Sequence, residues 1–100
     1  MRLTASLAIA SLLSIPMLFG QDRSFIEAKI EKWRQEVARN PKDYETLAAI
    51  GAGYGKLGEN ATAVIYFEKA IAVNPSYAGA YLGLGTAYGF LGRPDEAKRH

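Results

Sequence analysis

The sequence repeats itself at an interval of 34 residues. Between Asn40 and Tyr66, the positions that are identical at this offset are Asn40 and Asn74, Pro41 and Pro75, Gly51 and Gly85, Tyr54 and Tyr88, Gly55 and Gly89, Leu57 and Leu91, Gly58 and Gly92, and Ala63 and Ala97. Composition alone would rarely place glycines, tyrosines, alanine and proline in register in this way. A fixed period of this size indicates a structural repeat whose units stack on one another.

The first half of each unit has the pattern of a helix. Leu47, Ile50 and Tyr54 recur at the three- and four-residue spacing of one helix face. Asp43 precedes them as a candidate N-cap, and Gly58 follows them as a candidate helix end. The next unit repeats this plan with Tyr81, Leu84, Tyr88 and Gly92.

The second half of the first unit predicts another helix. Asn60 is placed to cap it, and it must stop near Asn74, because a residue before proline is pushed out of the helical region. Its apolar residues are Ala63, Val64, Phe67, Ala70 and Ile71. The sequence therefore predicts an all-α protein made of helix-turn-helix repeats, which is an α-solenoid.

These residues in register resemble the tetratricopeptide repeat. In the first unit the resemblance rests on Leu47-x-x-Ile50-Gly51-x-x-Tyr54, Ala63-x-x-x-Phe67, Ala70 and Pro75. In the second it rests on Tyr81-x-x-Leu84-Gly85-x-x-Tyr88 and Ala97. Leu47 and Tyr81 stand where the family usually has tryptophan, and both are large and apolar. The resemblance implies one repeat over residues 41–75 and a second, truncated repeat over residues 76–100.

Residues 1–20 have the layout of a secretory signal peptide. Arg2 is followed by an apolar run over residues 3–19, and Gly20 precedes a change to polar residues. We predict cleavage after Gly20, which would give a periplasmic or secreted protein. The alternative is an uncleaved inner-membrane anchor over residues 3–19, although a run of about 17 residues is near the lower limit for spanning a bilayer and Pro16 interrupts it.

Residues 21–40 predict one more helix before the first repeat. Its apolar residues recur at helical spacing and are Ile26, Ile30, Trp33 and Val37. Two interpretations are open. The helix either caps the open face of the first repeat, or it is the second helix of a degenerate earlier repeat, because Trp33 precedes Phe67 by the repeat interval.

Gly53, Gly55 and Gly58 also show the G-x-G-x-x-G spacing of a dinucleotide-binding loop. Such a loop needs a strand before it and a helix that opens after it, whereas residues 43–52 have helical spacing. The P-loop pattern fails too, because Leu57 stands where that pattern needs Ser or Thr. We therefore interpret these glycines as packing and helix-ending residues, and we expect no cofactor.

No constellation of residues predicts catalysis or metal binding. His100 is the only histidine, Ser24 and Ser76 are the only serines after the leader, and no base is placed to activate a hydroxyl. No cluster of histidines or carboxylates has metal-ligand spacing. Without Arg2, eleven Lys and Arg face ten Asp and Glu. This balance leaves no basic patch for a nucleic acid partner.

The resemblance implies that the first helix of each unit lines a concave groove that binds a peptide or another protein. The residues that we expect on the groove face are Glu45, Ala48, Ala52 and Lys56 in the first unit and Leu82, Thr86 and Phe90 in the second. Some family members hold a C-terminal carboxylate in this groove with Lys and Asn. Those residue types are missing at Ala48, Ala52, Leu82 and Thr86, so we predict no such clamp.

The other repeated positions are predicted to pack the helices together. The packing set is Gly51, Tyr54, Gly58, Ala63, Phe67, Ala70, Pro75, Gly85, Tyr88, Gly92 and Ala97. Gly51 and Gly85 are expected where two helices of a unit approach closely, and Gly58 and Gly92 where a left-handed residue ends a helix. This packing does not explain Gly53 and Gly55, each of which costs about 1 kcal/mol relative to alanine at a helix-interior position.

The sequence thus predicts an exported, all-helical repeat protein that binds a protein or peptide and has no catalysis of its own. One alternative is a membrane-anchored assembly factor with residues 3–19 uncleaved. Another is the docking arm of a larger enzyme whose catalytic domain lies beyond residue 100. The groove itself has an alternative interpretation, in which it packs against further repeats and holds no ligand.

Overall fold

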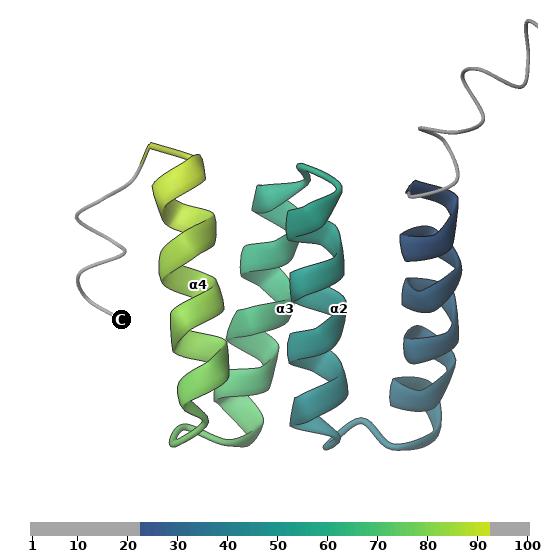
Figure 1. Ribbon diagram of the computed structural model, residues 1–100. Coiled ribbons are helices and arrows are strands. Elements are labelled where there is room, and N and C mark those ends of the chain that lie inside the picture. Colours follow the sequence, from purple (N-terminus) through teal and green to yellow (C-terminus); the bar gives the residue numbers. More distant parts are fainter. Residues whose placement is uncertain (1–22, 93–100) are drawn as a thin grey trace, which may run out of the picture.

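The computed structural model describes residues 23–92, which form four helices that lie side by side and alternate in direction (Figure 1). The first spans residues 23–39 and is called the leading helix below. It is followed by α2 (Tyr44–Lys56), α3 (Asn60–Val73) and α4 (Ala78–Phe90). No strand occurs in this part of the chain. The all-α class predicted from the sequence is therefore confirmed.

Several predictions from the sequence lie outside the described residues. These are the leader over residues 1–20, its alternative as an anchor over residues 3–19, and the packing position Ala97. Within residues 23–92, no helix has the length and apolar character needed to cross a membrane.

The ends of α2 follow the predicted chemistry. Asp43 is the N-cap: its Oδ1 accepts a hydrogen bond from the backbone N–H of Thr46 at 3.1 Å, and its Oδ2 accepts one from the Thr46 hydroxyl at 2.7 Å. After the helix, Gly58 has a φ of +81°, and Gly92 has a φ of +73° at the equivalent position after α4. Because other residues adopt this left-handed geometry only at a cost, glycine ends the first helix of both units.

The start of α3 differs from the sequence prediction. Glu59 is the N-cap, Asn60 is the first residue of the helix, and no side chain caps the first turn. The capping role predicted for Asn60 is wrong, because an N-cap residue has non-helical backbone angles and Asn60 is already helical. The end of α3 agrees with the prediction, since Asn74 is extended before Pro75.

The ring of Phe67 on α3 joins three helices. Phe67 is only 5% exposed. A Cβ added to Gly51 of α2 would lie 3.0 Å from this ring, and a Cβ added to Gly83 of α4 would overlap it. Glycine at these two positions therefore lets both α2 and α4 approach the ring of Phe67 closely. The other buried residues of this core are Leu47, Ala48, Ala63, Val64, Ala70, Ala80, Leu84, Ala87 and Tyr88.

The leading helix packs on α2 through Ile30, which is 4% exposed. A Cβ on Gly53 would lie 2.9 Å from Cγ1 of Ile30 and 3.7 Å from the ring of Trp33. Gly53, which the packing within one unit does not explain, is thus required by the approach of a neighbouring helix. These contacts suit both interpretations of the leading helix, as a cap and as part of an earlier repeat, so both stay predictions.

Two aromatic pairs also connect the helices. The rings of Tyr54 on α2 and Tyr66 on α3 are stacked with centroids 5.5 Å apart. The ring of Tyr44, the first residue of α2, meets that of Tyr77, the N-cap of α4, edge to face with centroids 5.0 Å apart. Such pairs stabilise a fold by about 0.5–1.5 kcal/mol beyond the free energy that comes from burying their surface area. The second pair holds together the ends of α2 and α4, the two helices that were predicted to line a groove.

Candidate functional site

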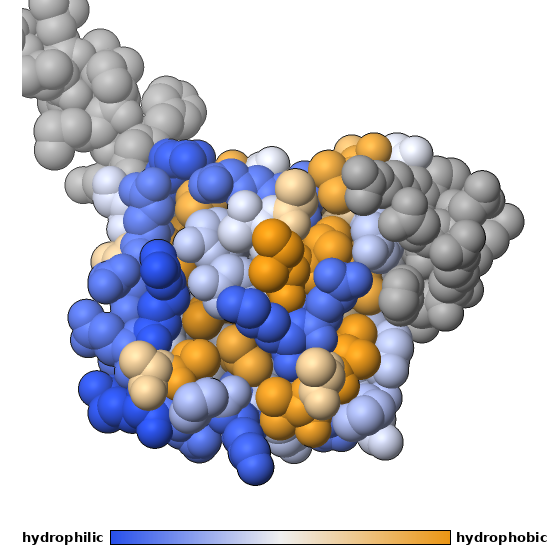
Figure 2. Space-filling view, turned by 180° about the vertical axis from the view of Figure 1, so that it is seen from behind, coloured by the Kyte–Doolittle hydropathy of each residue, from blue (hydrophilic) through white to orange (hydrophobic). Residues whose placement is uncertain are grey.

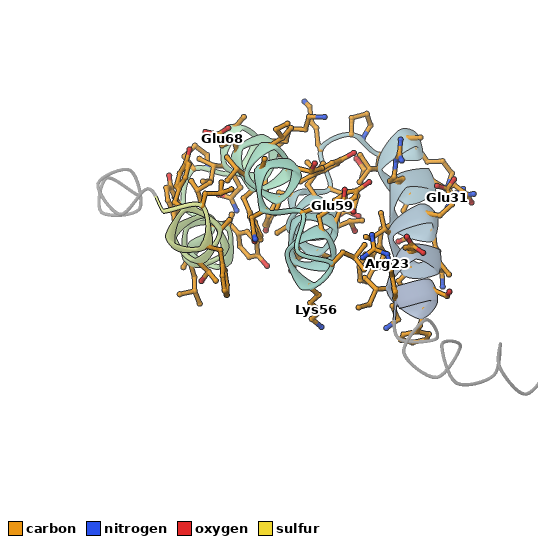
Figure 3. The ribbon with its side chains drawn as sticks, turned by 90° about the horizontal axis from the view of Figure 1, so that it is seen from above. Arg23, Glu31, Lys56, Glu59 and Glu68 are labelled. Atoms are coloured by element: carbon orange, nitrogen blue, oxygen red, sulfur yellow. The ribbon has the colours of Figure 1, made fainter. Side chains whose placement is uncertain are left out.

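A groove of about 670 Å³ lies between α2 and α4. Ala63 and Phe67 of α3 are part of its lining and are 0% and 5% exposed, so they form its floor. Figure 3 shows the arrangement along the helices, with α2 and α4 on one side and α3 behind them. The residues predicted for the groove all line it: Glu45, Ala48, Ala52, Lys56, Leu82, Thr86 and Phe90.

Other lining residues were not assigned to the groove from the sequence. They include Asn60 at the start of α3, Tyr77 before α4, and Gly83. Asn60 and Tyr77 lie where helices begin, and helical periodicity does not orient such positions. Gly83 carries no repeat signal, because the residue at the same offset in the first unit is Ala49.

Small side chains line most of both walls of the groove. Many lining residues have no side chain beyond Cβ, and they are Ala48, Ala49, Ala52 and Gly55 on α2, and Gly79, Gly83 and Ala87 on α4. Ala48 and Ala87 are themselves only 7% and 2% exposed, so they lie at the base of the walls. Small side chains along both walls let a bound chain approach the helices closely.

Two large apolar side chains of the lining are exposed to solvent. Leu82 is 76% exposed and Phe90 is 75% exposed, and both belong to α4. The hydroxyl of Thr86, which lies between them in sequence, donates a hydrogen bond to the carbonyl oxygen of Leu82 at 3.0 Å. The α4 wall thus offers apolar surface, and the hydroxyl of Thr86 already has an acceptor.

The charges of the groove lie at its ends. Glu45 is in the first turn of α2, and Lys56 is in the last turn. Lys56 points away from the helices in Figure 3.

The opposite face of the molecule, seen in Figure 2, has hydrophilic residues gathered over the leading helix. No group of metal-ligating residues occurs within residues 23–92.

The repeat predicted from the sequence is matched by known families and structures. Two models described as "Tetratricopeptide repeat" match the chain, one over residues 44–77 and the other over residues 66–99. The fold is similar to the second tetratricopeptide domain of Spaghetti (RPAP3) bound to an HSP90 peptide. The TM-score is 0.72 at 30% identity, over 74% of this chain and 68% of that one. The chain belongs to the tetratricopeptide repeat family.

Other relatives of this tetratricopeptide protein share a part of their length with it. The MamA structure matches with a TM-score of 0.71 at 30% identity, over 74% of this chain and 40% of MamA. Cellulose synthase operon protein C of Escherichia coli K12 is 46% identical over 58 residues, and the CTR9 homologue of Arabidopsis thaliana is 44% identical over 45 residues. The chain spans 5% and 4% of the length of these two curated relatives.

Membership of the family confirms the resemblance to the tetratricopeptide repeat and the all-α fold class that were predicted from the sequence. The tetratricopeptide fold is typically a non-catalytic binding scaffold, and domains of this family bind peptides or proteins. The described helices therefore form a repeat scaffold of the type that binds peptides or proteins.

Proposed function

We propose that the groove between α2 and α4 binds an extended segment of another protein. The observation that carries this proposal is the groove of about 670 Å³ with Leu82 and Phe90 exposed along one wall. Burial of one such apolar side chain contributes about 1.5–3 kcal/mol. Two of them supply a driving force for a ligand that covers them, and the small side chains of the walls give its backbone room.

The charges of the groove favour a mainly apolar segment as its occupant. Glu45 and Lys56 are the charged residues of the lining, and they have opposite signs. The Lys and Asn residues of a carboxylate clamp are missing from the central positions Ala48, Ala52 and Leu82. The similar Spaghetti domain is bound to a peptide, which supports a peptide segment as the class of ligand.

We further propose that the protein is exported, on the basis of the leader-like residues 1–20. The alternatives are an inner-membrane anchor over residues 3–19 and a role as the docking arm of a larger enzyme. The N-terminal residue of the mature protein separates the first two: a chain that begins at Gln21 supports export and excludes the anchor. A full reading frame without a catalytic domain beyond residue 100 excludes the docking arm.

Replacing Ala52 by arginine is expected to block the groove. Ala52 is exposed on α2 and lines the groove, and arginine is a good helix former, so the fold should be kept. Random nonapeptides are selected on the full chain, synthesised with a fluorophore, and measured by fluorescence polarisation. We expect Ala52→Arg to weaken their binding at least about tenfold, which corresponds to about 1.4 kcal/mol.

The matched control is Ala61→Arg. Ala61 is also an exposed helical alanine, but it lies on α3 outside the groove lining. We expect this variant to bind the selected peptides with the native affinity, and circular dichroism checks that both variants keep their helix content. Peptides that bind Ala52→Arg as tightly as they bind the native chain would rule out this groove as the binding site.

A further inference from the structure

A second hollow, of about 500 Å³, adjoins the groove on the other side of α2. The leading helix and α2 form it, and its lining is Phe25, Ile26, Lys29, Trp33, Ala49, Ala52, Gly53 and Lys56. Ala49, Ala52 and Lys56 line the groove between α2 and α4 as well. The ridge that separates the two hollows thus carries two methyl groups and one flexible side chain. A bound chain can therefore cross α2 from one hollow to the other.

The second hollow is positively charged. Lys29 and Lys56 are in its lining, which contains no acidic residue. Within residues 23–92 the ion pairs are those of Arg23 with Glu27 and Glu59, so neither lysine is neutralised there. The ammonium of Lys29 lies 4.9 Å from the ring centroid of Phe25 and 5.9 Å from that of Trp33. These rings hold the cation at the hollow without cancelling its charge.

The aromatic and cationic side chains gather at one end of the molecule. Lys56 and Phe90 are the last residues of α2 and α4, which run in the same direction (Figure 1). Phe25 belongs to the first turn of the described part of the leading helix, which runs the opposite way and so begins at that end. Across this end the order is therefore aromatic on the leading helix, cationic on α2 and aromatic on α4.

We propose that the ligand segment crosses α2, with a side-chain carboxylate between Lys29 and Lys56 and an apolar side chain beside Leu82 and Phe90. This inference rests on the peptide-binding function proposed above, and it adds the chemistry and the direction of the ligand. A pair of unneutralised ammonium groups is complementary to an acidic side chain. The continuous surface over the α2 ridge links this charge to the apolar wall of α4.

The carboxylate belongs to an internal side chain, not to a chain terminus. Besides the two lysines, the side-chain donor in the lining of the second hollow is the single indole N–H of Trp33. The lining includes no Arg, Asn, Gln, Ser or Thr, so it lacks the several fixed donors that would orient both oxygens of a terminal carboxylate. Lysine is a point charge on a flexible stem, so Lys29 and Lys56 can donate to a side-chain carboxylate that approaches from several directions.

The test uses the full chain and nonapeptides selected on it, offered with free and with amidated C-termini. We expect Asp or Glu to be enriched in the peptides that depend on Ala52. The double variant Lys29→Gln with Lys56→Gln is expected to weaken their binding about tenfold at low salt, and less in 0.3 M NaCl, where exposed charges are screened. Changing the acidic residue of the peptide to its amide should cause the same loss in the native chain and little further loss in the double variant.

Lys32→Gln with Lys42→Gln is the matched control, because these exposed lysines carry the same charge and lie outside both hollows. This variant should bind as the native chain does. Peptides that lose binding in Ala52→Arg but bind the Lys29/Lys56 double variant normally would overturn the inference and leave the groove proposal intact. Binding that needs a free C-terminus and ignores the acidic side chain would also overturn it. Peptides that show no dependence on Ala52 would overturn both proposals.

Discussion

Phe67→Ala is expected to lower the free energy of unfolding by about 3–5 kcal/mol, which is the usual cost of removing a buried aromatic ring. The ring is 5% exposed and fills the space left by Gly51 on α2 and Gly83 on α4. Alanine would leave a cavity at the point where three helices meet. Because small domains are stable by only about 5–15 kcal/mol, the loss is a large part of the total. Urea denaturation followed by circular dichroism measures it.

The matched control for this change is Ile65→Ala on the same helix. Ile65 is 51% exposed, so its truncation is expected to change the free energy of unfolding by less than about 1 kcal/mol. If both variants unfold at similar urea concentrations, Phe67 does not occupy the central position described here.

Gly83→Ala is expected to destabilise the protein by about 1–3 kcal/mol, as overpacking of a core does. This result opposes helix propensity, since alanine is favoured over glycine by about 1 kcal/mol in a helix interior. The added Cβ would overlap the ring of Phe67. The ring is only 5% exposed and also lies close to Gly51 of α2, so it has little room to move away from the added methyl group.

Gly89→Ala provides the control, since it makes the same substitution in the same helix. Among residues 23–92, no atom outside the helix's own nearby backbone lies within 4 Å of a Cβ on Gly89. The effect of Gly89→Ala should then come from the higher helix propensity of alanine alone, and we expect the free energy of unfolding to rise by about 0.5–1 kcal/mol. A gain of stability in both variants would show that α4 does not approach Phe67 as closely as the structure has it.

The repeat and the helix ends could be predicted from the sequence because they depend on local chemistry. Glycine after α2 and after α4, proline after α3 and Asp43 before α2 act on the backbone next to them. The start of α3 could not be fixed to the residue, since Glu59 and Asn60 are both able to precede a helix. Structure was needed to see that Asn60 is already helical.

Contacts between helices could be predicted only at positions where the same residue recurs in both repeat units. Gly51 is such a position, because Gly85 stands at the same offset, and it lies against Phe67. Gly83 is not, although its approach to Phe67 is the closer one. Gly53 owes its place to Ile30 of the leading helix, and no local pattern announces which helix will lie beside another.

The candidate groove was predictable in outline for a related reason. One face of a helix can be read from its period, so the positions on α2 and α4 followed from the family resemblance. Tyr77 and Asn60 also line the groove. They lie at the starts of helices, where helical periodicity does not predict which way a side chain points. The second hollow depends on how the leading helix packs on α2, and the sequence left the role of that helix open.

Gly83 belongs to both the packing and the groove, because it lies close to the ring of Phe67 and lines the space between α2 and α4. The position of α4, and with it the positions of Leu82 and Phe90, is therefore set by how closely its backbone approaches one ring. The position of the α4 wall of the groove thus depends on a single packed ring.

A double-mutant cycle of Gly83→Ala and Phe67→Leu, measured by urea denaturation, tests the claim that the backbone at Gly83 packs against the ring of Phe67. Leucine is smaller than phenylalanine and leaves room for the added methyl group. We therefore expect the double variant to be more stable than the sum of the two single losses implies, by about 1 kcal/mol or more. Losses that add to within about 0.5 kcal/mol would contradict the claim, because residues that do not touch behave in that way.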